Sequence, residues 1–163
     1  MTSIKKVPCM AATIAENTNQ NIQENYTISL EKCKVQLLQK IVNQIRSHET
    51  RPGQKWPGTK PAGMPITCRY PNLAAEILAR KCFLWYPADV MNITKERLAN
   101  VLEGGEELGI NEADLICSHW ALTIDYLFSK TLFTVSDDQS IITAAQFRQE
   151  RKNQEKENTY VNL

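Results

Sequence analysis

Apolar residues recur every three to four positions along residues 29–49, and this spacing predicts an amphipathic helix. Its apolar stripe consists of Leu30, Leu37, Leu38, Ile41, Val42 and Ile45. Ser29 stands where its hydroxyl can cap the first turn. Such a stripe needs a partner, either the domain that follows it or the same helix of a second copy. It is too short to specify a coiled coil.

Residues 70–130 have the pattern of several short helices. In the segment NLAAEILARK, Leu73, Ile77 and Leu78 share one side, and Asn72 is the expected cap. A second helix is expected to begin near Tyr86 and to be short, because Pro87 suits the first turn of a helix.

A break at Asn92 separates this helix from the next one. Asparagine tolerates the left-handed backbone conformation that ends a helix sharply. Thr94 is placed to cap the following segment KERLANVLEG, which Gly104 and Gly105 are expected to end. The positions of this helix expected to face the core are Leu98, Val101 and Leu102.

The segment NEADLICSHWALTIDYLF predicts a further helix. It is expected to break near Leu122–Thr123, before a last turn over residues 124–128. The residues expected in its core face are Ala113, Leu115, Ile116 and Trp120.

The two ends of the chain are more polar than its middle. Residues 1–28 contain the low-complexity stretch ENTNQNIQEN and are expected to be flexible. Residues 131–163 form an extension, expected to start a helix near Ala144 and then to fray into a partly disordered end.

Residues 51–69 contain four of the seven prolines and three of the six glycines. Because proline removes backbone donors, no regular helix or central strand is expected here. The segment is either a linker or an arm that follows a phosphate backbone or enters a minor groove, where Trp56 could stack on a base. Its basic residues, with no acidic residue among them, are Arg51, Lys55, Lys60 and Arg69.

Charge is unevenly distributed along the chain. Up to Arg69 there are 10 Lys and Arg against 4 Asp and Glu, a net charge of +6, and from Tyr70 onward there are 9 against 14, a net charge of −5. These sum to the overall +1. Residues 70–130 alone have 5 basic and 9 acidic residues, a net charge of −4. The two halves are therefore expected to have different partners or to contact each other.

The order of small, turn, hydroxyl and leucine positions in residues 70–130 resembles the lambda repressor/Cro-like helix-turn-helix family. The residues that carry the resemblance are Ala88, Asn92, Ile93, Thr94, Leu98, Leu102 and Gly104, and the later LTIDYLF resembles the family's closing fifth helix. The resemblance implies an all-α fold. A five-helix domain would follow the amphipathic helix at 29–50 and the Pro/Gly-rich basic linker at 51–69. The sequence departs from the family at 83–87, where a polar donor often starts the second helix.

The resemblance also implies a DNA-reading face on the second helix of the motif. Thr94 and the helix N-terminus suit a phosphate oxygen. Lys95 or Arg97 could donate to guanine, and Asn100 could pair with adenine. Glu96 could accept from cytosine or simply repel phosphate. The arm would add contacts to the DNA backbone from Arg51, Lys55, Trp56, Lys60 and Arg69.

By this resemblance the chain is expected to be a cytoplasmic, sequence-specific transcriptional regulator of the repressor type, from a bacterium or a mobile element. It would bind double-stranded DNA as a homodimer, formed through the 29–50 helix or the C-terminal extension. The net negative charge of residues 70–130 opposes this function, because nonspecific affinity for DNA comes mainly from cations on phosphates.

The alternative is a phage or mobile-element interaction protein that reuses the fold to inhibit a protein or nucleoprotein target, such as a CRISPR nuclease. Its acidic surface would then mimic nucleic acid. The aromatic cluster at 83–86 is either part of the core or an exposed patch for a protein partner.

No enzyme is expected, since a phosphate loop, a nucleophile elbow and HExxH are all missing from the sequence, and His48 and His119 lie far apart in it. Neither a cofactor nor a metal is expected. The five cysteines are widely spaced without a CxxC pair, which indicates reduced thiols rather than disulfides or a zinc site. No apolar stretch approaches the roughly 20 residues of a membrane span, so no membrane partner is expected.

Overall fold

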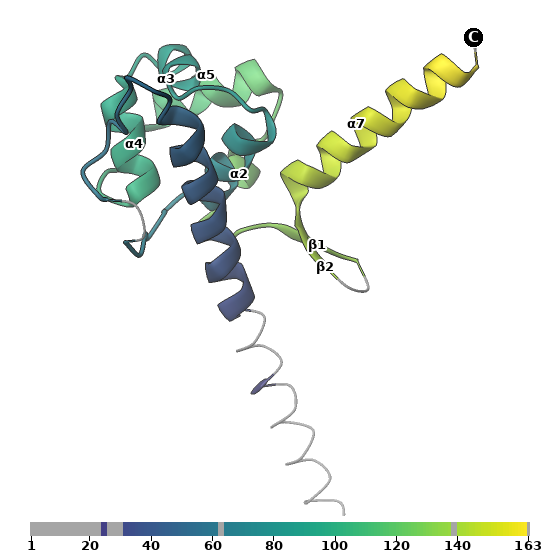
Figure 1. Cartoon of the computed structure of the whole chain (residues 1–163), viewed down its shortest axis with the longest axis horizontal. Coiled ribbons are helices and arrows are strands. Elements are labelled where there is room, and N and C mark those ends of the chain that lie inside the picture. Colours follow the sequence, from purple (N-terminus) through teal and green to yellow (C-terminus); the bar gives the residue numbers. More distant parts are fainter. Residues whose placement is uncertain (1–23, 26–30, 62–63, 138–139, 163) are drawn as a thin grey trace, which may run out of the picture. The chain divides into compact units, whose positions relative to one another are not determined.

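The computed structural model describes residues 24–25, 31–61, 64–137 and 140–162 (Figure 1). Residues 37–163 form one compact unit, separate from residues 1–36. The segment 1–28, expected to be flexible, lies outside the described residues except for residues 24 and 25, which are helical. Ser29 and Leu30 also lie outside them. No helix among the described residues is long and apolar enough to cross a membrane.

Residues 31–49 form the helix that the apolar stripe predicts, drawn in dark blue in Figure 1. Ile41, Val42 and Ile45 are at most 3% exposed and belong to the main hydrophobic core. Leu37 and Leu38 are partly buried against that core. From residue 37 onward the stripe therefore docks on its own domain, and the buried side chains are not available as a seam with a second copy.

The described residues of 51–69 form neither a helix nor a strand, as their prolines predict. The segment is nevertheless packed against the domain. Ile66 and Cys68 lie in the main core, and Trp56 packs on its edge. The segment 51–69 therefore does more than link the helix at 31–49 to α2, because its side chains also pack on the domain core.

Helix α2 (Pro71–Ala79) begins with a proline, whose fixed φ and missing N–H suit the first turn. The prediction that Asn72 caps this helix is wrong. Tyr70 occupies the cap position without a side-chain hydrogen bond, and Asn72 is fully buried in the first turn. Its side-chain amide forms hydrogen bonds with residues that lie 54 to 61 positions later in the chain. A short sequence window does not reveal such distant partners.

A tight turn separates α3 (Trp85–Val90) from α4 (Lys95–Glu103). Asn92 has a φ of 55°, the left-handed conformation that was predicted for it. The Thr94 hydroxyl accepts a hydrogen bond from the N–H of Arg97 at 3.2 Å and so caps α4. Both local predictions are confirmed.

The far end of α4 is set by Gly104, which has a φ of 86°. A Cβ at this position would also collide with the carbonyl of Thr67, so the close approach of the 51–69 segment requires glycine here. The predicted core positions of α4, namely Leu98, Val101 and Leu102, are buried, and so is Ala88 of α3.

Helices α5 (Ile110–Trp120) and α6 (Ile124–Leu127) are separated near the predicted break. Ala121 takes a left-handed φ of 54°, and Thr123 caps α6 by accepting from the N–H of Tyr126. The prediction that Leu115 is a core residue is wrong, since it is 43% exposed. The buried face of α5 is set instead by Ala113, Ile116, Cys117 and Trp120.

A β-hairpin that the sequence patterns did not predict follows α6. Strands β1 (Thr134–Asp137) and β2 (Ser140–Thr143) are antiparallel, with Thr134 opposite Thr143. The described structure is therefore mostly helical with one small sheet, which is compatible with the expected all-α fold class.

Helix α7 (Ala144–Val161) begins at the predicted residue, where Thr143 accepts a hydrogen bond from the N–H of Gln146. It does not fray early, as was expected, but continues to Val161. Only Ala145 is buried in α7, and residues 149–162 are all exposed. The second half of this helix is therefore an uncovered surface.

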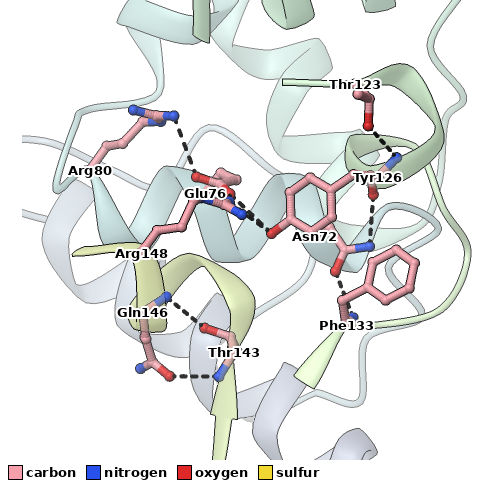
Figure 2. Close-up of polar contacts among 9 residues, drawn as sticks. All are labelled: Asn72, Glu76, Arg80, Thr123, Tyr126, Phe133, Thr143, Gln146 and Arg148. Carbon is pink, nitrogen blue, oxygen red and sulfur yellow. Dashed lines mark hydrogen bonds and ion pairs between the residues drawn. The ribbon is translucent and has the colours of Figure 1, made fainter. Parts of the chain in front are cut away.

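Asn72 connects α2 to the chain beyond α6, as Figure 2 shows. Its Nδ2 donates to the carbonyls of Tyr126 and Thr131, both at 2.9 Å. Its Oδ1 accepts from the N–H of Phe133 at 2.9 Å. One buried side chain thus satisfies three backbone groups in the connection between α6 and the hairpin.

Glu76 forms a second link from α2 (Figure 2). Its carboxylate is buried, accepts from the Tyr126 hydroxyl at 3.0 Å, and pairs with Arg80 at 3.5 Å. Arg148 of α7 completes the cluster by pairing with the same carboxylate and placing its guanidinium 4.8 Å from the centre of the Tyr126 ring. The first turns of α7 are held on α2 by this buried charge.

Candidate functional site on helix α4

The outward face of α4 carries the five residues predicted to read DNA. Thr94 at the N-cap and Lys95 and Glu96 in the first turn are exposed, whereas Arg97 and Asn100 are half-buried. Because Leu98 and Leu102 fix the opposite face in the core, the exposed side is determined by packing.

Arg97 is not free to reach outward, because residues of the loop after α4 and of α5 hold its guanidinium. Nη1 donates to the carboxylate of Glu112, Nε lies 3.3 Å from the carboxylate of Glu106, and Nη2 donates to the carbonyl of Glu107 at 3.2 Å. The hydrogen bond to Glu112 raises the pKa of Arg97 above its ordinary value.

Asn100 is also engaged by the acidic loop. Its Nδ2 donates to Glu106 at 3.4 Å, so Glu106 contacts two of the five predicted base-reading side chains. Of the three charged residues among the five, Arg97 is paired, whereas Lys95 and Glu96 form no ion pair with any described residue. The acidic stretch at 106–112 therefore competes directly with any anion for this face.

The pKa of Glu112 reflects these same contacts. Burial alone would raise it, but the N–H of Gly109, which donates at 2.8 Å, and the Arg97 guanidinium together hold the pKa of this carboxyl below its ordinary value. Glu112 therefore remains charged and keeps Arg97 in place.

The five predicted arm residues are dispersed rather than brought together. Arg51 places its guanidinium over the Phe83 ring at 4.4 Å, Lys55 is exposed, and Arg69 pairs with Glu107. Trp56 and Lys60 both turn toward α4, where they bind Glu103. The side chains of Trp56 and Arg69 thus bind carboxylates of the domain, whereas the Lys60 ammonium donates to the backbone carbonyl of Glu103 at 3.1 Å.

Glu103, the last residue of α4, was not singled out by the sequence patterns. It is 1% exposed, and its carboxylate accepts from the indole N–H of Trp56 at 2.8 Å. It also accepts from the Thr59 N–H and hydroxyl, both at 3.1 Å, and from the Lys60 N–H at 2.9 Å. We call Glu103 with Trp56, Thr59 and Lys60 the Glu103 anchor. It ties the 51–69 segment to the end of α4.

The aromatic cluster at 83–86 divides between core and surface. Leu84 is fully buried, and Phe83 is half-buried and stacks on His48 with ring centres 4.4 Å apart. Trp85 is 57% exposed and Tyr86 is 37% exposed. The Tyr86 hydroxyl lies 2.6 Å from Nε2 of His119 on α5, and these two rings with Trp85 form an exposed aromatic patch beside the start of α3.

The cysteines and the other metal-ligating side chains do not assemble into a centre among the described residues. No group of three or more His, Cys, Asp or Glu side chains is placed there to hold a metal ion. Four cysteines, Cys33, Cys68, Cys82 and Cys117, are reduced, while Cys9 lies outside the described residues. Burial raises the pKa of the Cys68 thiol to about 11, so it behaves as a core residue.

No model of a known protein family, no curated protein and no solved structure matches the chain.

Proposed function

We propose that this chain is a sequence-specific DNA-binding regulator with a helix-turn-helix fold. In this proposal α3 and α4 form the motif, and α2, α5 and α6 complete a five-helix domain that resembles the lambda repressor/Cro-like family. The observation that carries the proposal is the α3–α4 unit itself. The left-handed Asn92 turn, the Thr94 cap and the buried leucines together expose one face and the N-terminal turn of α4.

The first turn of α4 has the chemistry that a DNA backbone needs. The N–H groups at the start of a helix carry a partial positive charge, and the Thr94 hydroxyl lies beside them. Lys95 is exposed next to this turn and adds a full positive charge. A phosphate at the helix start and a base edge near Lys95 are the contacts that these groups favour.

Arg97 and Asn100 would join the interface by exchanging their acidic partners for DNA. Both ion pairs of Arg97 are at least partly exposed, so the exchange does not leave a buried charge behind. Glu106 and Glu112 then act as competitors that weaken nonspecific binding, because any phosphate must displace them. A specific DNA sequence would bind more tightly than other sequences, because its bases form hydrogen bonds with Arg97 and Asn100 that offset the loss of their acidic partners.

A repressor-type regulator also requires a second copy. Since residues 37–49 dock on their own domain, we assign this role to the exposed second half of α7 in the C-terminal extension. Sedimentation of the full chain, and of a chain ending after Arg148, measures whether that segment carries the self-association.

Selection of duplexes from a random DNA pool, followed by fluorescence anisotropy at two salt concentrations, tests the proposal. We expect a defined sequence to be enriched and its affinity to fall steeply with salt. The double variant R97A/N100A should lose at least about tenfold in affinity for that sequence, because each base contact is worth about 1–3 kcal/mol. K130A removes an exposed positive charge elsewhere and is the matched control.

The acidic competitors offer a second arm of the same experiment. E106Q removes a charge that faces both Arg97 and Asn100, so it should tighten DNA binding severalfold. D125N removes an exposed acid on α6 and should change the affinity little. Failure to retain any duplex at low salt, or full retention of specificity by R97A/N100A, would rule out DNA reading by α4.

A second candidate is an interaction protein that uses the same fold to bind a protein or nucleoprotein target. Two observations favour it. Arg97 and Asn100 are already bound by acidic residues, and Trp85 and Tyr86 form an exposed aromatic patch of the kind enriched in protein interfaces. This candidate predicts a complex that survives nuclease treatment and is lost in W85A. L115A, at an exposed leucine of α5, is the control.

A further inference from the structure

A cavity of about 530 Å³ lies between the helix at 31–49 and residues 56–61. Its volume falls in the range of sites that take small organic molecules. One wall is formed by Asn43, Arg46, Ser47 and Thr50, and the facing wall by Trp56 and Lys60 with their neighbours. Both walls are therefore rich in polar groups.

Arg46 is the group in this cavity whose donors are only partly satisfied, although its guanidinium also lies 5.6 Å from the centre of the Trp56 ring. Its side chain is 6% exposed, and Nη1 donates to the carbonyl of Pro61 at 3.4 Å. Nη2 lies 3.5 Å from Glu103, close enough for charge attraction, yet neither Nη2 nor Nε has a hydrogen-bond acceptor among the described residues. Buried donors without acceptors cost free energy, so the Arg46 guanidinium, which forms part of the cavity wall, is short of acceptors.

Glu103 cannot supply that acceptor. Its two carboxylate oxygens already receive four hydrogen bonds from the other members of the Glu103 anchor. The charged groups around this end of the cavity are Arg46, Lys60 and Glu103, which leaves one positive charge in excess. A ligand with an anionic oxygen group would balance this charge and satisfy the guanidinium.

The remaining wall favours an organic body over a bare ion. The Ser47 hydroxyl donates to the carbonyl of Asn43 at 3.0 Å, and the Thr50 hydroxyl donates to the carbonyl of Arg46 at 2.9 Å. Their hydrogens are therefore used, and their oxygens can only accept. The Trp56 ring adds an apolar surface.

We propose that this cavity binds a small organic anion. Its carboxylate or phosphate group pairs with the Arg46 guanidinium in the cavity wall, and its N–H or O–H groups donate to Ser47 and Thr50. The site does not depend on DNA binding by α4.

Thermal unfolding and calorimetric titration of the full chain test this site. The probes are L-glutamate as the carboxylate, a ribonucleoside 5′-monophosphate as the organic phosphate, and inorganic phosphate as the bare ion, each against sodium chloride of matched ionic strength. We expect one organic probe to raise the Tm saturably, by about 5 °C or more at roughly a hundredfold excess over its Kd. Which organic probe does so identifies the anionic group.

Two variants locate the effect. R46M removes the guanidinium, and N43W fills the cavity from its exposed rim without touching Glu103, so it remains informative if R46M folds poorly. Q44W, at the next residue of the same helix, faces a different, smaller cavity and is the matched control. Both R46M and N43W should abolish the Tm shift, and Q44W should keep it.

Three results would overturn the inference. One is the absence of a saturable shift beyond that of sodium chloride with either organic probe at millimolar concentration. Another is a shift that persists in N43W. The third is inorganic phosphate binding as tightly as the better organic probe, since the accepting hydroxyls would then contribute nothing.

Discussion

The indole N–H of Trp56 donates to the carboxylate of Glu103 at 2.8 Å, across 47 residues of sequence. Burial of this carboxylate would raise its pKa, but the hydrogen bonds from Trp56 and from the Lys60 and Thr59 amides outweigh it and lower the pKa below the ordinary 4.5. Trp56 and its neighbours thus bind the charged form of Glu103 in preference to the neutral form.

E103Q is expected to destabilise the fold by about 3 kcal/mol near neutral pH, because several donors would lose a charged acceptor and one would face an amide N–H. Urea denaturation measures this change. Because the folded pKa is lower than the unfolded one, the stabilisation by Glu103 is complete above pH 4.5 and is lost as pH falls through the folded pKa. E96Q, at an exposed acid of the same helix, should change little. Equal stabilities of E103Q and E96Q would contradict the role of the Glu103 anchor.

Gly58 lies against this same pair of side chains. A Cβ at Gly58 would collide with the Glu103 carboxylate and with the Trp56 indole nitrogen, and the carboxylate is held by four hydrogen bonds and cannot move aside. G58A should therefore cost about 2 kcal/mol in denaturation experiments. At Gly105 the nearest atom to an added Cβ is 3.5 Å away, so G105A should be nearly neutral. If G105A destabilised the fold more than G58A, residues 56–60 would not be held against α4.

Asn72 provides a separate test in the C-terminal part of the domain. N72A should cost about 3 kcal/mol, because it removes the hydrogen bonds of Asn72 to the Thr131 carbonyl, to the N–H of Phe133 and to the Tyr126 carbonyl, of which only the last keeps a second partner, the N–H of Ser129. Hydrogen exchange should speed up most around residues 131–135. N153A, at an exposed asparagine of α7, is the control. A uniform rise in exchange over the whole chain would argue against a local connection.

Tyr126, in the same region, should make the stability of the fold depend on pH under alkaline conditions. Burial raises its pKa to about 12 from the ordinary 10.0, and the nearby Arg80 only partly offsets this. The unfolded chain therefore releases this proton first, and stability should fall as pH rises from about 10 to 12. In Y126F that part of the loss should disappear, although the variant starts from a lower stability. Y160F, at an exposed tyrosine of α7, should leave the pH profile unchanged.

Local sequence signals predicted the middle of the domain well. Asn92, Thr94 and Gly104 each act through their own backbone or through a residue three positions away, so their effect is readable from a short window. Leu115 shows the limit of the same method. It stands next to Ile116 in an apolar run, and only the packing of α5 decides which of the two faces the core.

Contacts between distant segments were not predictable in this way. Asn72 was expected to cap a helix because asparagine does so often, but its partners lie 54 to 61 residues away. Glu103 looked like an ordinary acid at the end of a helix, and its partners lie 43 to 47 residues before it. The ion pair of Arg97 could have been predicted from the sequence. The acidic residues that follow Gly105 lie in the loop directly after α4, close enough to reach its side chains.

The two ends of α4 are held by residues other than the exposed Lys95 and Glu96. Thr94 fixes the start through the backbone, and Glu103 fixes the end through residues 56–60. Between these two ends, the exposed side chains of Lys95 and Glu96 take no part in the contacts that hold α4 in place. The helix can therefore serve as a scaffold whose outer positions are randomised in a library, with new specificities sought at nearly constant stability.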